Sequence, residues 1–125
     1  MAKIEKFEDL LAWQASRELT KRVYEISSTE KLLKNFSLRD QMQRAAVSIM
    51  SNIAEGFERS TNKDKIHFFN MARASCGELR SLLYVCLDNQ SLDANTVASV
   101  QEQAIRTGKL ISGFIRSLRG HLQKL

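Results

Sequence analysis

The stretch FFNMARASCGELRSLLYVC, residues 68–86, decides the fold of this chain. Its apolar side chains recur at alternating steps of three and four residues, a seven-residue repeat typical of helices that pack in a bundle. The repeating positions are Phe69, Ala72, Cys76, Leu79, Leu83 and Cys86. We therefore expect one long helix that starts at a Thr61 cap, with Asp64 in the reciprocal position, and runs to about Leu87.

Three further helices are expected from the same periodicity. The first spans residues 9–27 with Asp9 as N-cap, the second spans residues 37–57 and opens on a Ser37–Asp40 capping box, and the last begins at Asp93. Their apolar stripes are Leu11, Ala15, Leu19, Val23 and Ile26; Leu38, Met42, Ala45, Ile49 and Ile53; and Val97, Val100, Ala104, Thr107, Ile111, Phe114, Leu118 and Leu122. Short polar connections between them, including residues 28–35, favour antiparallel neighbours. The expected fold is an all-α, up-down-up-down four-helix bundle that fills residues 1–125 as one domain.

Composition agrees with a few long helices. The 125 residues include no proline and only five glycines, which leaves few places to turn. No apolar run approaches the roughly 20 residues of a membrane span, and Met1–Lys6 lacks the features of a secretory signal. We expect a cytoplasmic protein with reduced thiols, in which Cys76 and Cys86 are small core residues.

The helix at residues 37–57 carries a second, polar stripe on another face. Its members are Gln41, Arg44, Ser48, Ser51, Asn52 and Glu55. Small residues let a neighbouring backbone approach, and Arg44 and Glu55 can supply charge-assisted hydrogen bonds there. The stripe is either a solvated face or a packed contact, within the bundle or between subunits.

The helix at residues 61–87 also has a second stripe, which widens its apolar face. It consists of Phe68, Met71, Ser75, Glu78, Leu82 and Val85. A carboxylate among apolar neighbours needs a cation, so we expect Glu78 to form a structural ion pair with Arg44 unless it reaches water at the edge of the stripe. A helix this apolar favours a homo-oligomer.

Three segments resemble one protein family over roughly residues 4–120. QMQRAAVSIMSNIAEG, residues 41–56, is similar to the signature of the bacterial four-helix bundle proteins encoded in intervening sequences of large-subunit ribosomal RNA genes. FEDLLAWQA, residues 7–15, and ARASCGEL, residues 72–79, resemble the opening and the third-helix motif of that family. The chain departs from it at Met50, where the family often has proline, and in the proline-free loop after the first helix.

The resemblance implies a four-helix bundle that assembles into a homopentamer and has no accepted enzymatic activity. It also implies kinship in fold with the accessory variability proteins of diversity-generating retroelements, which are basic and associate with a reverse transcriptase and nucleic acid. Kinship in fold alone does not assign a function.

A basic run in the last helix is the strongest sign of a nucleic-acid partner. No acidic residue follows Glu102, and the net charge of the chain is +5. The cations of this run are Arg106, Lys109, Arg116, Arg119 and Lys124, and Arg59, Lys63 and Lys65 are expected to assist them. Lysines and arginines opposite an apolar stripe neutralise phosphates with little sequence preference, although they are also typical of a solvated surface.

Motifs for catalysis are missing from the sequence. His67 and His121 belong to no His-Glu-x-x-His motif, and the Asp64–His67 pair lacks the second half of a bundle di-metal site because Leu118 precedes His121 by three residues. We therefore expect no enzyme, no metal and no cofactor. Two hypotheses stay open: a basic oligomeric adaptor that binds RNA or DNA weakly, and an oligomeric scaffold for a protein partner.

Overall fold

Every element of this computed structural model is helical. The structure describes residues 4–124, and side chains as far as Gly120. In chain order the elements are the 3-10 helix η1 (Phe7–Asp9) and the α-helices α1 (Leu11–Ile26), α2 (Glu30–Lys34), α3 (Phe36–Glu58), α4 (Asn62–Asp88) and α5 (Ala94–Lys124). No strand occurs within residues 4–124. The prediction of an all-α fold is confirmed.

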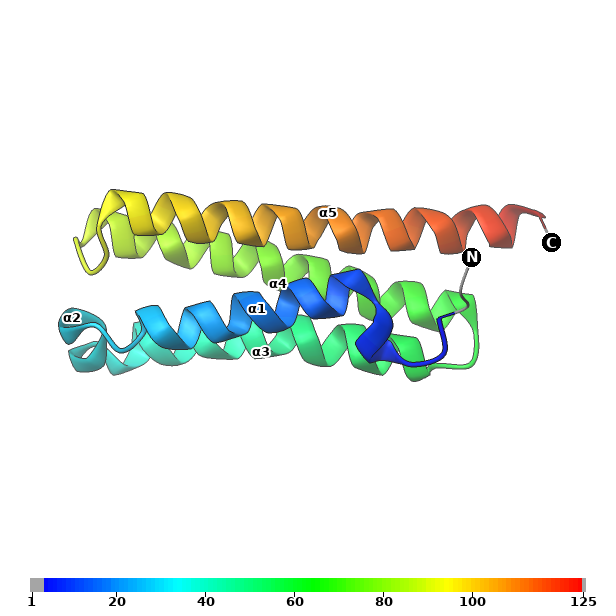
Figure 1. Ribbon diagram of the computed structural model, residues 1–125, viewed down its shortest axis with the longest axis horizontal. Coiled ribbons are helices and arrows are strands. Elements are labelled where there is room, and N and C mark those ends of the chain that lie inside the picture. Colours follow the sequence, from blue (N-terminus) through cyan, green and yellow to red (C-terminus); the bar gives the residue numbers. More distant parts are fainter. Residues whose placement is uncertain (1–3, 125) are drawn as a thin grey trace.

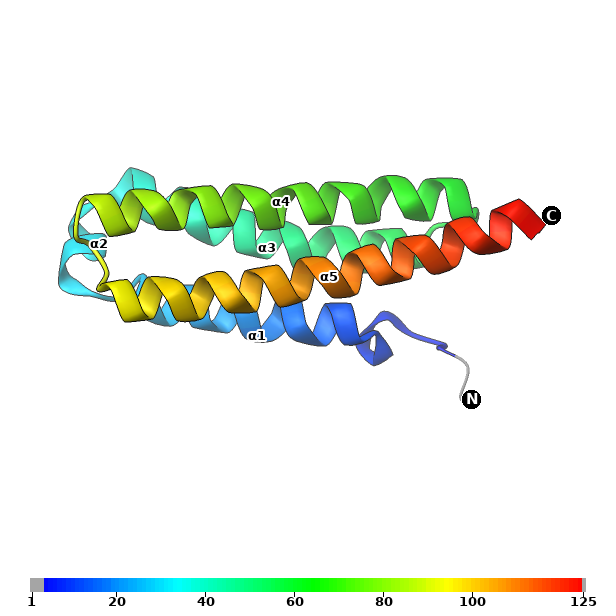
Figure 2. The same cartoon turned by 90° about the horizontal axis from the view of Figure 1, so that it is seen from above.

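Four long helices lie side by side, and each of α3 and α5 packs against both α1 and α4. Figure 1 shows the α3–α4 turn and the end of α5 at one end of the molecule, with α2 and the α4–α5 turn at the other. Figure 2 shows α4 and α5 running past each other in opposite directions. Their register is marked by the Phe69 and Phe114 rings, whose centroids are 5.2 Å apart.

Two of the predicted helix starts are confirmed. The Thr61 hydroxyl accepts a hydrogen bond from the Asp64 amide at 3.2 Å, and the Asp93 carboxylate accepts one from the Thr96 amide at 2.7 Å. The bond from Thr96 holds the pKa of Asp93 below its usual range. These caps satisfy amides that the first turn of a helix leaves without partners.

The other two predicted caps are wrong. Asp9 lies in η1, and α1 starts after Leu10 without a side-chain cap. Ser37 lies inside α3, whose cap is the Asn35 side chain, which accepts from the Leu38 amide at 3.3 Å. The loop predicted at residues 28–35 contains α2, which docks on the core through the fully buried Leu32.

All members of the predicted apolar stripes of α3 and α4 are buried. The stripe of α1 is partly wrong, because Leu11 is 67% exposed and Ala12 and Ser16 are buried instead. These small residues permit a close approach to α3, and the Thr20 hydroxyl reaches across to the Ala46 carbonyl at 3.2 Å.

In α5, Ile115 is buried beside the predicted positions. The side chains of His121, Leu122 and Lys124 lie outside the described residues.

Gly56 marks a close approach of α3 to α4. A Cβ built there would lie 3.0 Å from the Phe68 Cβ and 3.2 Å from the Lys65 carbonyl oxygen. Both of those atoms are fixed to the α4 backbone, so they cannot move without shifting the helix. A Cβ built on Gly77 of α4 would meet no atom within 4 Å.

The two glycines therefore form a matched test of this packing. We expect Gly56→Ala to lower the free energy of unfolding by about 1 to 2 kcal/mol, because overpacking outweighs the better helix propensity of alanine. Gly77→Ala should raise it by up to about 1 kcal/mol, because only the propensity changes. Urea unfolding followed by circular dichroism measures both. Equal effects of the two substitutions would contradict the close α3–α4 contact.

Candidate nucleic-acid interface

A shallow basic groove runs between α4 and α5. We call it the α4–α5 groove, and its volume is about 270 Å³. It is lined by Arg73, Cys76, Gly77, Arg80, Ala104, Ile105, Gly108, Lys109 and Ser112. Small residues form much of the lining, and a Cβ on Gly77 or Gly108 would project into open space. The groove is therefore open enough to admit a flat or branched polar group between the long cationic side chains.

Neutral partners hold the two arginines of α4 in this groove. One terminal nitrogen of Arg73, Nη1, donates to the Ser112 hydroxyl at 3.3 Å, and the other, Nη2, donates to the side-chain oxygen Oδ1 of Asn70 at 2.9 Å. The Nε of Arg80 donates to the Gln101 side chain at 3.4 Å, and the Gln101 amide donates back to the Arg80 carbonyl at 3.0 Å. These bonds orient the guanidinium groups without neutralising them.

Ion pairs lie elsewhere on the described surface. They join Lys34 to Glu30, Arg44 to Asp40 and Arg59 to Glu55. Among the described residues, no carboxylate pairs with Arg73, Arg80 or Lys109. The groove therefore keeps its positive charge, which favours an anionic ligand.

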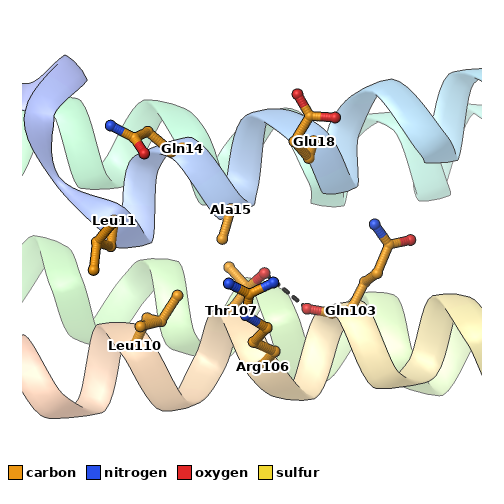
Figure 3. A pocket seen from close by; sticks show the side chains of 8 residues that line it. All are labelled: Leu11, Gln14, Ala15, Glu18, Gln103, Arg106, Thr107 and Leu110. Atoms are coloured by element: carbon orange, nitrogen blue, oxygen red, sulfur yellow. Dashed lines mark hydrogen bonds between the residues drawn. The ribbon is translucent and has the colours of Figure 1, made fainter.

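The four described cations predicted on α5 are exposed, but they do not share one face. Arg106 reaches between α5 and α1, where it lines a pocket with Gln14 and Glu18 (Figure 3). Lys109 lies between the two flanks, because it lines both the α4–α5 groove and a pocket with Asp9, Leu10 and Leu11. Arg116 follows Lys109 by seven residues and Arg119 follows the groove residue Ser112 by seven, so two turns place Arg116 in line with Lys109 and Arg119 in line with Ser112. Lys124 ends α5, and its side chain is outside the described residues.

The three assisting cations lie at the α3–α4 turn, and two of them make local contacts. Arg59 donates to Glu55 at 2.7 Å and stacks over the Phe68 ring at 4.5 Å. Lys65 donates to the Phe57 carbonyl and lies 5.2 Å from the centre of the Phe57 ring. Both side chains thus tie the turn together, whereas Lys63 is exposed. A role in binding for these three residues stays a prediction.

The polar stripe of α3 makes one packed contact with α4. The Ser48 and Ser75 hydroxyls are 2.9 Å apart, and Asn52 donates to the Ser48 carbonyl at 2.9 Å. The predicted intrachain pair of Arg44 with Glu78 is wrong: Arg44 lies 3.9 Å from Asp40, and Glu78 is exposed. The two serines occupy the α3–α4 contact, which leaves Arg44 and Glu78 on the outer surface. Contacts of Arg44, Glu78, Glu55 and Asn52 with another subunit stay a prediction.

Arg73 and Arg80 were missed in the sequence. They belong to a stripe at steps of four, three and four residues that also contains Gly77 and Tyr84. The acid-free run after Glu102 points to α5 alone, whereas α4 brings these two cations to the same surface. The periodicity of α4 was the available signal, since this stripe lies beside the apolar one.

Burial leaves both cysteines poor nucleophiles. It raises the pKa of Cys76 to about 12 and the pKa of Cys86 to about 11. The Cys86 thiol lies 3.4 Å from the sulfur of Met42, deep between α4 and α3.

Among the described residues, no group of three or more His, Cys, Asp or Glu side chains is placed to hold a metal ion.

Comparison with known proteins places this bundle in a family. Residues 8–113 match the family model described as 23S rRNA-intervening sequence protein. The chain belongs to this family. A protein of unknown function from the S23 ribosomal protein family of Bacteroides thetaiotaomicron has a solved structure with the same fold, at a TM-score of 0.78 and 22% identity. The match covers 84% of this chain and 98% of that one.

No curated protein matches the chain. None of the helices within the described residues has the length and apolar character that would let it cross a membrane.

The exposed position of Arg44 gives a direct test of the corrected ion pair. Arg44→Ala should change the free energy of unfolding by less than about 1 kcal/mol, because exposed i, i+4 pairs contribute little. Glu78→Ala should have an equally small effect. Leu79→Ala, at the adjacent buried position, should cost about 2 to 5 kcal/mol and serves as the positive control. If Arg44→Ala and Glu78→Ala both lowered the free energy of unfolding by about 2 kcal/mol or more, a buried Arg44–Glu78 pair would be supported after all.

Proposed function

We propose that this protein is a non-enzymatic accessory protein of the cytoplasm that binds RNA or DNA weakly through the α4–α5 groove. The observation that carries the proposal is the set of cations on this side of the molecule. Its members are Arg73, Arg80, Lys109, Arg116 and Arg119. Within the described residues, none of these five forms an ion pair.

Phosphate is the ligand chemistry that such a groove favours. Guanidinium groups donate two hydrogen bonds at once to phosphate oxygens, and Arg73 and Arg80 are already oriented by neutral partners. Arg73 and Arg80 are seven residues apart on one helix, which corresponds to about 10 Å along its axis. Cations spread over this length suit a polymer of phosphates better than a single small anion. The description of the family by 23S rRNA agrees with an RNA partner.

Phosphate contacts set affinity and its salt dependence, while base edges set sequence preference. The amide group of Gln101 is buried beside the groove and bonded to Arg80, so it is not free to read a base. Binding is therefore expected to depend on salt far more than on sequence.

Replacing Arg73, Arg80, Lys109 and Arg116 together by glutamine should weaken binding of an RNA hairpin. The slope of log affinity against log salt should fall by about 0.7 to 0.9 for every phosphate contact that is lost. Fluorescence anisotropy over a salt series measures both quantities.

The matched control replaces Arg17, Lys21, Lys34 and Arg106, which are exposed on other faces, by glutamine. Either quadruple variant takes the net charge from +5 to +1. If the control weakens binding as much as the groove variant does, total charge governs binding and the groove is not the site.

We further propose that this chain, an up-down-up-down bundle, assembles as a homo-oligomer, with the pentamer as the expected state. The α3–α4 face supports this, because Met71 and Val85 are 43% and 46% exposed on α4 beside the Ser48–Ser75 contact. Apolar side chains in such a position favour burial against another subunit. The same face would serve a protein partner if the chain acts as a scaffold without nucleic acid, which is the second candidate function.

Assembly can be tested on this face. Light scattering at micromolar concentration should report an oligomer for the parent protein, and Met71→Glu with Val85→Glu should give monomers. Leu11→Glu with Leu33→Glu is the control, because these side chains are at least as exposed but lie on α1 and α2. A monomeric parent protein would refute self-assembly, and an oligomer that survives the α4 substitutions would place the interface elsewhere.

A further inference from the structure

An exposed tyrosine extends the stripe of arginines along α4. Tyr84 lies four residues beyond Arg80, which is one helical turn or about 6 Å along the axis. Its side chain is 54% exposed, and within the described residues it stacks on no other aromatic ring. An aromatic face of this size in contact with water is available for stacking.

We infer that the α4–α5 groove takes single-stranded nucleic acid, with a base stacked on Tyr84 while the neighbouring phosphates contact Arg80 and Arg73. This inference rests on the proposed function and names the form of nucleic acid that the site accepts. A cationic track with an aromatic platform beside it is the arrangement by which proteins bind single strands without sequence preference.

Stacking on Tyr84 requires an unstacked base, so it distinguishes single strands from duplexes. In a duplex the faces of the bases are stacked on one another, so Tyr84 has no base to receive, and only the arginines and lysines make contact. In a single strand the bases are free to turn towards the protein. Phosphate contacts therefore contribute to the binding of both single strands and duplexes, whereas the contact with Tyr84 contributes only to the binding of single strands.

The charge pattern along α4 predicts in which direction a bound strand extends from Tyr84. Arg73, Gly77, Arg80 and Tyr84 share one stripe, and the next member of that stripe is the exposed Asp88. A carboxylate repels phosphate, so the strand extends from Tyr84 back towards Arg80 and Arg73. It then continues towards the part of α5 that carries Lys109, Arg116 and Arg119. Figure 1 shows that α5 runs from the α4–α5 turn towards the opposite end of the molecule.

The groove between the two arginines has room for the sugar-phosphate chain. Gly77 of α4 and Gly108 of α5 both line it, and each faces open space. Lys109 stands at the same groove and adds a third cation. Tyr84 does not line the groove itself, but it lies one helical turn beyond Arg80, which does.

The test compares Tyr84→Ala, Tyr84→Phe and Arg80→Gln with the parent protein. The probes are a fluorescein-labelled oligouridylate of about 12 nucleotides, its deoxy counterpart, and an RNA duplex of equal length, at about 50 mM salt. Tyr84→Ala should weaken single-strand binding about five- to a hundredfold and leave duplex binding unchanged. Tyr84→Phe keeps the ring and should bind like the parent protein, whereas Arg80→Gln should weaken all three probes.

Tyr24→Ala is the matched control, because Tyr24 is 46% exposed on α1, away from the groove, and should leave every affinity unchanged. Circular dichroism checks that each variant keeps its helices. Equal affinity for the ribose and deoxyribose strands supports recognition through base and phosphate alone. Tighter binding of the ribose strand supports the same recognition together with a contact to the 2′-hydroxyl.

Two outcomes would overturn the inference, and they differ in what they leave standing. If Tyr84→Ala binds the oligouridylate as tightly as the parent protein while Arg80→Gln does not, the stacking role is wrong and the proposed function stands. If the parent protein binds none of the three probes, both the inference and the proposed function are wrong.

Discussion

Burial of the seven-residue stripe of α4 is the constraint on which the rest of the structure depends. Removing a side chain such as Phe69, Leu79 or Leu83 from water contributes about 1.5 to 3 kcal/mol, and all three are almost fully buried. An exposed ion pair contributes about 0 to 1 kcal/mol, so it cannot turn the helix against this preference. Once the stripe faces inward, the rotation of α4 is set. The stripe of Arg73 and Arg80 then faces α5, and the stripe of Met71 and Ser75 flanks α3.

Small residues decide how closely the helices approach each other. At Gly56 the α3 backbone comes so near α4 that a single methyl group would touch the Lys65 carbonyl. On the other side of α3, the buried Ser16 lets α1 settle close enough for Thr20 to bond with the Ala46 carbonyl. Near the start of α1 the buried positions are held by the small residues Ala12 and Ser16, whereas Leu19, Val23 and Ile26 fill the inner face further along the helix. Leu11 is on the surface, although its spacing in sequence matches the apolar stripe, because the inward position of the first turn is taken by Ala12.

Two pairs of cations along α3 and α4 have different physical roles. Arg59 and Lys65 contact carboxylate, carbonyl and aromatic groups of the same turn, so they stabilise the chain reversal between α3 and α4. Arg73 and Arg80 are held by neutral groups of α4 and α5 and keep their full charge. The bundle thus separates a basic groove on one side of α4 from an apolar face on the other. That separation allows one chain to combine self-association with the binding of a polyanion, as proposed.

The sequence by itself determined the helical class, the stripes of α3 and α4, and the caps at Thr61 and Asp93, because each depends on residues within a few turns of one another. It also pointed to the family through residues 41–56, within the part that the family model matches. Only the tertiary structure decided that residues 30–34 form a helix, because that short segment is stabilised by docking Leu32 into the core. It likewise decided that Arg106 lines a pocket with α1 and that Lys109 shares a groove with the arginines of α4. Periodicity reports which side of a helix faces the core, but the identity of the neighbour on each flank depends on packing between segments far apart in the chain.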